Sequence, residues 1–350
     1  MSHFSRISGE WKYFMSNNYN YRFNMRTGLF FRWGKTLQDD PYRSEYGPEI
    51  ADIEITTICS GSNGLSCPYC YKDNNSKGIN MALDSFKSII NTINTNNQLT
   101  QVAFGLGSTG EENPSLWEMC TWLLKQNIIP NGTIADISNE TADKIATYFG
   151  SCAVSLHSKN GSYDICYDSV KRLTDRGMSQ VNIHYVLSEE TYEECFKVLN
   201  DIQTDPRLHK LNALVFLSLK TKGRAVDNKF RCLCTEKFSR LIKKALEMKI
   251  NIGFDSCSYP KFKQTVSGMP NEKQLLMMAE GCESFGRFSI YVNVEGKAYP
   301  CSFCENTTSY TGVGEDIISS SLMDIWNGKQ NTDGQKQLDE NDGNCPIFDI

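Results

Sequence analysis

Residues 56–73, TTICSGSNGLSCPYCYKD, place three cysteines directly after a predicted strand. Cys59, Cys67 and Cys70 follow the spacing C-x7-C-x2-C, and the apolar run at 51–59 before them has the length of a buried strand. Three thiols in one loop are one short of the usual four-cysteine complement of an iron–sulfur cluster. A structural zinc site on Cys67 and Cys70 is the alternative, and it needs two further nitrogen or sulfur ligands.

The chain after residue 49 repeats a strand and then a helix, which predicts an α/β fold with a parallel sheet. We expect strands at 51–59, 100–108, 131–136, 151–157, 180–188 and 211–220. We expect helices at 81–94, 115–126, 139–149, 163–176, 191–202 and 236–249. Each unit takes about 35 residues, the length of a βα unit whose strands are parallel. A complete eight-unit barrel takes about 250 residues, so six units predict a partial (β/α)6 barrel over 49–256. The three cysteines then lie at the carboxyl ends of its strands, where such barrels place their chemistry.

Residues 1–48 form an aromatic-rich N-terminal extension. They hold twelve aromatic side chains, and seven Lys or Arg against four Asp or Glu. Tyr19, Tyr21 and Phe23 alternate with polar residues, and the alternation resumes at 29–33 after a turn, which predicts a β-hairpin with one aromatic face. This face either covers an open edge of the main domain or guides a substrate. We favour the first interpretation, because aromatic stripes are usually core.

Residues 257–350 are predicted to form a small C-terminal domain with few regular elements. We expect a hairpin at 288–303, a short helix near 322–326, and polar loops elsewhere, including 329–344. Such a segment has a poor hydrophobic core of its own, for which a metal centre would compensate. Five cysteines fall in this region, namely Cys257, Cys282, Cys301, Cys304 and Cys345.

The composition is that of a soluble globular enzyme. The chain has 350 residues, 40% of them hydrophobic and 22% charged, with a net charge of -5 that argues against a general nucleic-acid-coating role. It has no apolar run of the roughly 18 residues that span a bilayer and no secretory signal. We therefore expect a cytoplasmic location and no membrane partner. In a reducing compartment the 14 cysteines do not predict disulfides.

The first cysteine group resembles the cluster-binding loop of the radical S-adenosylmethionine (radical SAM) superfamily. In that family three cysteines after the first barrel strand, with an aromatic residue before the last, hold a [4Fe–4S] cluster, and here the aromatic residue is Tyr69. The family's open iron chelates the amino and carboxylate groups of SAM, and one electron cleaves SAM to methionine and a 5′-deoxyadenosyl radical. The usual first gap of three residues is seven here. Doubling a loop costs only about 0.6 kcal/mol of closure entropy, so the ligand set tolerates the insertion.

A glycine-rich turn after the second predicted strand resembles the family's SAM-ammonium-binding turn. It reads FGLGSTGEENP at 104–114, and small residues there let a ligand approach the backbone. Ser155, at the end of the fourth predicted strand, matches a position where the family often contacts the ribose. The resemblance therefore implies cofactor contacts from Tyr69, Ser108, Thr109, Gly110, Glu111 and Ser155.

The C-terminal cysteines resemble those of twitch and SPASM domains, which bind auxiliary iron–sulfur clusters. Cys282, Gly296 and Cys301 follow C-x13-G-x4-C, and the predicted helix at 322–326 resembles the short helix that commonly follows. The full seven-cysteine SPASM pattern is absent from the sequence, so the resemblance implies one auxiliary [4Fe–4S] cluster. Its implied ligands are Cys257, Cys282, Cys301 and Cys345, with Cys304 left out.

The resemblance as a whole implies a radical SAM enzyme, of an oxidoreductase or peptide-modifying type. It implies SAM and two [4Fe–4S] clusters as cofactors, and an electron donor such as flavodoxin or ferredoxin as a partner. Similar auxiliary domains occur in peptide- and protein-modifying enzymes, so a peptide or protein is the first expected substrate. The basic, aromatic N-terminus keeps a nucleotide- or nucleic-acid-modifying enzyme as an alternative. A non-enzymatic, metal-stapled binding protein is the third reading.

Overall fold

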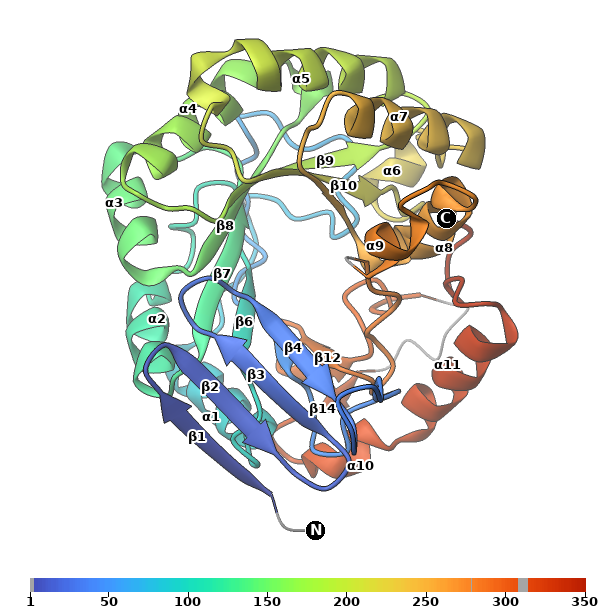
Figure 1. Ribbon diagram of the computed structural model, residues 1–350. Coiled ribbons are helices and arrows are strands. Elements are labelled where there is room, and N and C mark those ends of the chain that lie inside the picture. Colours follow the sequence, from blue (N-terminus) through green and yellow to red (C-terminus); the bar gives the residue numbers. More distant parts are fainter. Residues whose placement is uncertain (1–2, 278, 308–313) are drawn as a thin grey trace.

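The computed structural model describes residues 3–277, 279–307 and 314–350, and its main body is a partial barrel of parallel strands ringed by helices (Figure 1). The parallel strands lie side by side in chain order: β5 Ile50–Glu54, β6 Gln101–Gly105, β7 Ile129–Ile134, β8 Ser151–Ser155, β9 Val181–Leu187, β10 Ala213–Ser218 and β11 Ile252–Phe254. The main helices outside them are α1 Leu83–Ile93, α2 Leu116–Lys125, α3 Asn139–Tyr148, α4 Tyr163–Asp175, α5 Tyr192–Thr204 and α7 Thr235–Glu247. The predicted α/β partial barrel is confirmed, and the short strand β11 adds one strand to the expected six.

Alternation along the strands separates the hydrophobic core from the barrel interior. On β5, Ala51 and Ile53 are buried in the main core between sheet and helices. Asp52 and Glu54, on the opposite face of the same strand, line a cavity inside the barrel. A strand with apolar residues on one side and carboxylates on the other therefore gives the barrel a polar lining.

The C-terminal hairpin extends the barrel sheet beyond β5. Strand β12, Ser289–Val292, pairs in parallel with β5 and antiparallel with β13, Lys297–Tyr299, to which β14, Glu315–Asp316, adds. Gly296 forms the turn with φ +79, a conformation that favours glycine. The C-terminal segment is thus a continuation of the barrel wall.

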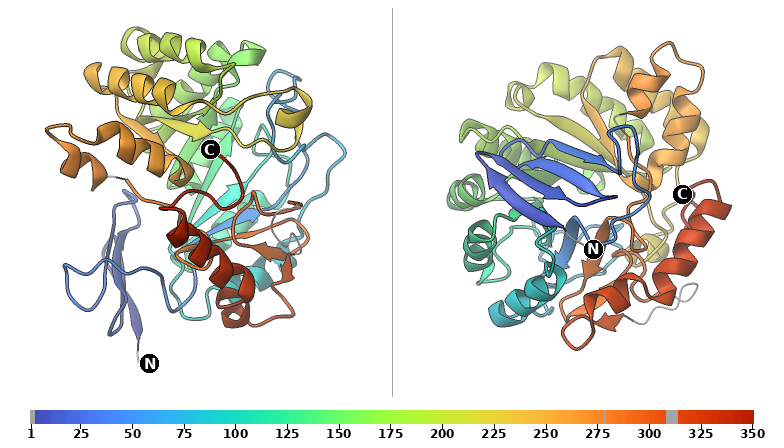
Figure 2. Two further views of the ribbon diagram at one scale, coloured as in Figure 1. Left: turned by 90° about the vertical axis from the view of Figure 1, so that its right-hand side faces the viewer. Right: turned by 60° about the horizontal axis from the view of Figure 1, so that its bottom comes forward.

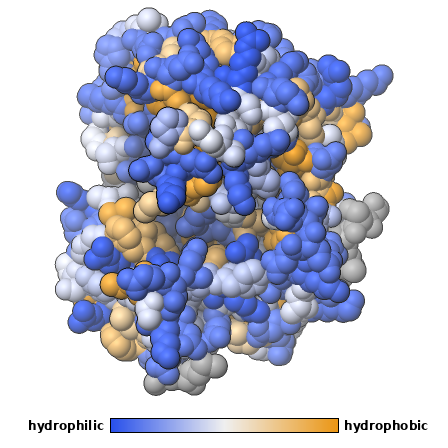
Figure 3. Space-filling model, turned by 45° about the vertical axis from the view of Figure 1, so that its right-hand side comes forward, coloured by the Kyte–Doolittle hydropathy of each residue, from blue (hydrophilic) through white to orange (hydrophobic). Residues whose placement is uncertain are grey.

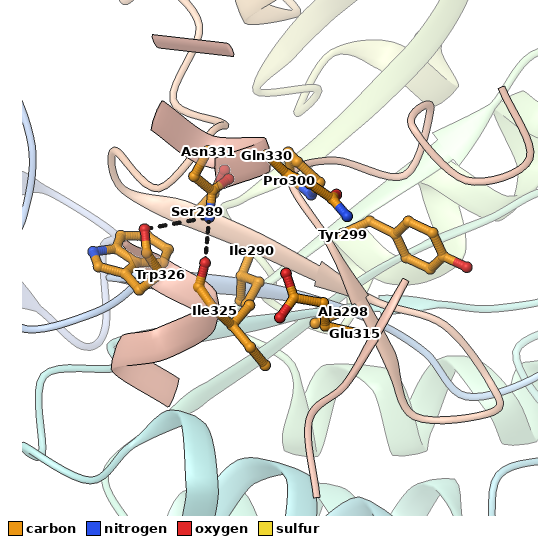
Figure 4. A pocket seen from close by; sticks show the side chains of 10 residues that line it. All are labelled: Ser289, Ile290, Ala298, Tyr299, Pro300, Glu315, Ile325, Trp326, Gln330 and Asn331. Carbon is orange, nitrogen blue, oxygen red and sulfur yellow. Dashed lines mark hydrogen bonds between the residues drawn. The ribbon is translucent and has the colours of Figure 1, made fainter. Parts of the chain in front are cut away.

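The helices of the C-terminal segment are α8 Tyr259–Val266, α9 Glu272–Leu276, α10 Leu322–Trp326 and α11 Lys329–Glu340. The predicted short helix is present as α10, but the prediction of polar loops at 329–344 is wrong over most of that range. Helix α11 has no apolar stripe in its sequence. Its buried residues are Asn331, Gly334 and Leu338, and only the leucine is a large apolar residue. The Asn331 side-chain amide donates to the carbonyls of Ile325 and Trp326 at 3.0 and 3.3 Å, so hydrogen bonds fix α11 to α10 (Figure 4).

The N-terminal extension is a four-stranded antiparallel sheet rather than a single hairpin. Its strands are β1 Phe4–Ser8, β2 Trp11–Met15, β3 Asn20–Asn24 and β4 Phe30–Trp33. The predicted hairpin is β3 and β4, and the prediction missed the other two strands. Figures 1 and 2 show the sheet as a layer across one end of the barrel.

The aromatic face of this sheet packs against the amino ends of the barrel strands. Phe14, Tyr21 and Phe23 form a buried cluster that includes Phe288 just before β12. The Lys12 ammonium donates to the Leu99 carbonyl at 2.7 Å, and the Tyr21 hydroxyl donates to the Gln98 carbonyl at 2.6 Å, both just before β6. The sheet therefore covers the end of the barrel opposite to the strand carboxyl ends, and not an open edge of the main domain as the sequence predicted.

Within the part of the chain that the structure describes, no helix has the length and apolar character needed to cross a membrane. The face drawn in Figure 3 is largely hydrophilic, with small separate apolar patches and a hollow across its middle.

Candidate active site

A cavity of about 470 Å³ lies inside the barrel and reaches the carboxyl ends of its strands. Strands β5 to β10 and the cysteine loop supply its walls. Six of the predicted site residues line it, namely Cys59, Cys67, Tyr69, Cys70, Ser108 and Ser155. The fold thus brings the first cysteine group and part of the predicted SAM-binding residues to one open space.

The four extra residues of the cysteine loop are absorbed by a tight turn of their own. The backbone groups of Ser62 and Leu65 bond to each other in both directions, at 3.1 and 2.9 Å. Gly61 has φ +77, and a Cβ there would lie 2.1 Å from the Leu65 carbonyl oxygen, so glycine is required for this close approach. The insertion therefore closes on itself as a compact turn between Cys59 and Cys67.

The segment after β10 holds the cysteine loop from the other side. Helix α6, Arg224–Asp227, begins with the Arg224 amide donating to the Cys70 carbonyl at 3.0 Å. The Arg224 side chain donates to the Cys67 carbonyl at 2.8 Å, and the Asn228 side-chain amide donates to the Pro68 carbonyl at 2.8 Å. Sequence analysis missed these residues, because no local motif marks them. The one local signal in the sequence was Gly223, which directly precedes the helix that begins at Arg224.

The three thiols fit an iron–sulfur cluster by their donor chemistry. Burial raises the pKa of Cys67 to about 12, with a further rise from its neighbour Cys70. A neutral thiol must lose its proton to bind metal, so binding here releases protons. Among the described residues, no three His, Cys, Asp or Glu side chains are arranged to hold a single metal ion. Cysteine thiolates are the usual ligands of [4Fe–4S] clusters, and here three of them face one open cavity.

In the glycine-rich turn the Glu112 side chain folds back onto the turn itself, whereas Glu111 faces outward. Glu111 faces outward, with its side chain 43% exposed and 3.8 Å from the Lys144 ammonium. Glu112 accepts hydrogen bonds from the Thr109 amide at 2.9 Å and from the Ser108 hydroxyl at 3.3 Å. The second carboxylate oxygen of Glu112 is buried without a partner among the described residues. Thr109 and Gly110 form the turn without lining the cavity, so of the four residues predicted here only Ser108 reaches it.

The wall opposite this turn carries neutral polar groups. Burial lowers the pKa of both His157 and His184 to about 4, so both rings are uncharged at neutral pH. The His157 ring lies edge-on to Tyr69, with centroids 6.0 Å apart, and its Nδ1 is buried with no partner in the described part of the chain. With Ser155, these rings offer hydrogen bonds to a polar ligand without adding charge.

The charged side chains of the cavity form pairs, with one exception. Lys72 pairs with Glu54 at 3.1 Å and with Glu305, which ties the cysteine loop to the segment after β13. Lys220 pairs with Asp255. Asp52 has no ion-pair partner among the described residues, and burial raises its pKa to about 6.

The second cysteine group lies in the C-terminal segment beside a second cavity. Cys257 and Cys345 line this cavity, which has a volume of about 450 Å³. Burial raises the pKa of Cys282 to about 12, and the neighbouring thiols of Cys301 and Cys345 raise it further. The structure therefore brings the four predicted auxiliary ligands into one neighbourhood. The prediction left Cys304 out. Its sulfur atom lies 3.5 Å from that of Cys301, so Cys304 is a fifth candidate ligand.

Comparisons with known proteins identify a domain and a fold. The SPASM family, described as an iron–sulfur cluster-binding domain, matches residues 282–346. No curated protein matches the sequence. The structure of Streptococcus suis SuiB bound to precursor peptide SuiA has a TM-score of 0.66 at 12% identity, covering 95% of this chain and 90% of SuiB. SuiB bound to S-adenosylmethionine has a TM-score of 0.63 at 14% identity, with the same coverage. The chain thus has the fold of SuiB and a SPASM match over its C-terminal region.

Proposed function

We propose that this chain, which joins a SPASM cluster-binding domain to the fold of SuiB, is a radical SAM enzyme acting on a peptide or protein. The observation that carries the proposal is the position of Cys59, Cys67 and Cys70 on one cavity at the carboxyl ends of barrel strands. We assign residues 49–256 to the barrel, 257–350 to the cluster-binding domain and 1–48 to the extension.

The residues of the cavity have separate roles in this proposal. The thiolates of Cys59, Cys67 and Cys70 would hold the [4Fe–4S] cluster, which would supply the electron for cleavage of SAM to a 5′-deoxyadenosyl radical. The Ser108 hydroxyl lines the cavity, and the Glu112 carboxylate accepts its hydrogen bond from the turn behind it; together they would offer acceptor oxygens for the SAM ammonium. Ser155 and His157, which line the cavity, offer hydrogen bonds to hydroxyl groups of a ligand.

A peptide substrate is supported by the shared fold, since SuiB was crystallised with its precursor peptide SuiA. The nucleotide alternative was favoured by the basic, aromatic N-terminus. In the structure the aromatic face of that extension is buried against the amino ends of the strands, away from the cysteine loop. This feature therefore gives the nucleotide alternative no support. The proposal includes an electron donor such as flavodoxin or ferredoxin. It also includes a cytoplasmic location, because free thiols persist in a reducing compartment.

The test is formation of 5′-deoxyadenosine by the anaerobically reconstituted enzyme, with dithionite as reductant. Wild type should convert SAM to deoxyadenosine, and Cys70→Ala should abolish the product together with the first cluster. Cys234→Ala is the matched control, because this exposed cysteine lies outside both groups. Absence of product from iron-loaded wild type would instead support the metal-stapled binding protein.

The auxiliary group is tested in the same assay. Cys301→Ala should retain some cleavage of SAM that is uncoupled from substrate, because its thiol lies in the C-terminal segment and not on the SAM cavity. Loss of all cleavage in Cys301→Ala with the first cluster intact by iron count would contradict this division of roles.

A further inference from the structure

Lys220 is a buried lysine located between the two cysteine sites. Its residue is 4% exposed, and its side chain lines the barrel cavity just after the end of β10. The ammonium donates to the Ser218 carbonyl at 2.9 Å and is paired with Asp255. A lysine is rarely buried to this extent unless it is paired, and here Asp255 is the partner. Removing two charges from water still costs free energy, which suggests that the pair has a function.

Asp255, the partner of Lys220, builds the turn that carries Cys257. The turn is the short 3-10 helix Ser256–Ser258, and Asp255 precedes it. The Ser258 hydroxyl donates to the Asp255 carboxylate at 2.5 Å, and the Ser218 amide donates to the same carboxylate at 3.2 Å. The turn that carries Cys257 is therefore held by the same carboxylate that pairs with Lys220.

A second cysteine-bearing segment also contacts the Lys220 ammonium. The Lys220 nitrogen lies 4.8 Å from the centroid of the Phe303 ring, and Phe303 stands between Cys301 and Cys304 in the chain. Lys220 thus pairs with the carboxylate that holds the turn of one proposed auxiliary ligand, Cys257, and contacts the segment that carries another, Cys301.

We propose that Lys220 is a positioning residue that raises the reduction potential of the auxiliary cluster. The inference rests on the proposed function, because it requires a cluster at the second cysteine group. Reduction adds one negative charge to a cluster, and a cation buried nearby in a low-dielectric site stabilises that charge. The Asp255 carboxylate moderates the effect, so the pair sets the potential together.

The experiment is a redox titration followed by electron paramagnetic resonance, in the full chain with Cys59, Cys67 and Cys70 changed to Ala. In this background only the auxiliary cluster contributes a signal. Lys220→Met should lower the ratio of reduced to oxidised cluster about tenfold at fixed potential, which is about 59 mV for a one-electron couple. Lys220→Arg should retain most of the wild-type value, because the charge is kept. Lys244→Met, at an exposed lysine on α7, is the control and should change nothing.

Asp255→Asn provides a test of opposite sign. Removal of the carboxylate leaves the Lys220 charge uncompensated, so the potential should rise. An unchanged potential in Lys220→Met with full iron content would overturn the inference. If Lys220→Met does not load iron, the test is Asp255→Asn alone. An unchanged or lower reduction potential of the auxiliary cluster in Asp255→Asn would then overturn the inference. A parent protein with no iron at the second group would instead remove the proposed auxiliary cluster, which is a distinguishable result.

Discussion

Asp52 shows what an unpaired charge costs inside the barrel. Its pKa is raised to about 6 from an ordinary value of 3.8, because burial disfavours the carboxylate. The folded state therefore holds the proton more tightly than the unfolded state. This penalty is absent well below pH 4, grows between pH 4 and 6, and is complete above pH 6.

We predict that Asp52→Asn stabilises the protein in a pH-dependent way. At pH 8 the free energy of unfolding should exceed that of wild type by up to about 3 kcal/mol, since one pKa unit corresponds to 1.36 kcal/mol. At pH 5 the gain should be clearly smaller. Denaturant unfolding of both proteins at the two pH values measures this, and an equal gain at both would contradict a role for ionisation.

The two adjacent glutamates of the glycine-rich turn make a matched pair. Glu112→Gln should weaken SAM binding about tenfold, because a buried charged acceptor is removed, and such hydrogen bonds contribute about 1.5–3 kcal/mol. Glu111→Gln should leave the affinity unchanged, since that side chain faces outward beside Lys144. Equilibrium binding of SAM to both iron-loaded variants checks this. The reverse order of effects would restore the sequence-based choice of Glu111.

At the scale of the element, the cysteine loop depends on the glycine that begins α6. Gly223 has φ +57, and a Cβ there would lie 2.5 Å from the Cys70 carbonyl oxygen. Gly223→Ala should therefore displace the loop and lower the iron content of the first cluster. Gly9→Ala is the control, because Gly9 has φ +59 with nothing within 4 Å of its added Cβ. Equal iron content in the two variants would contradict the prediction, because it would show that the close approach of Gly223 to the Cys70 carbonyl does not affect the cluster.

The elements that the sequence predicted well are those with a strong local signal. The barrel strands and their helices have clear periodicity, and the first cysteine group has a spacing that needs no tertiary information. Helix α11 was missed because its buried side consists of Asn331, Gly334 and one leucine. Glu112, Lys220 and Arg224 were missed for another reason. The roles proposed for them depend on which way a side chain turns and on contacts between segments far apart in the chain.

At the scale of the whole molecule, the C-terminal segment completes the barrel as well as carrying cysteines. Strand β12 covers the edge of β5, and Ile290 and Val292 belong to the main core. We predict that a chain ending at residue 256 is insoluble, because it exposes an unpaired apolar strand edge. The control is the full chain with Cys282 and Cys301 changed to Ala, which should stay soluble. The soluble fraction on expression is the measurement, and a soluble, folded 1–256 fragment would contradict the prediction.

The pairing of β12 with β5 also has a consequence for how the protein is made. Ser289 lies opposite Ile50, so the two strands are separated by about 240 residues of chain. During translation, β5 leaves the ribosome long before the strand that will protect it. The β5 edge of the nascent barrel stays open until β12 has been made, and contacts of such long range form slowly. Pairing of β12 with β5 is therefore a late event in folding, and Cys282 and Cys301, on either side of β12 in the chain, reach their places with it.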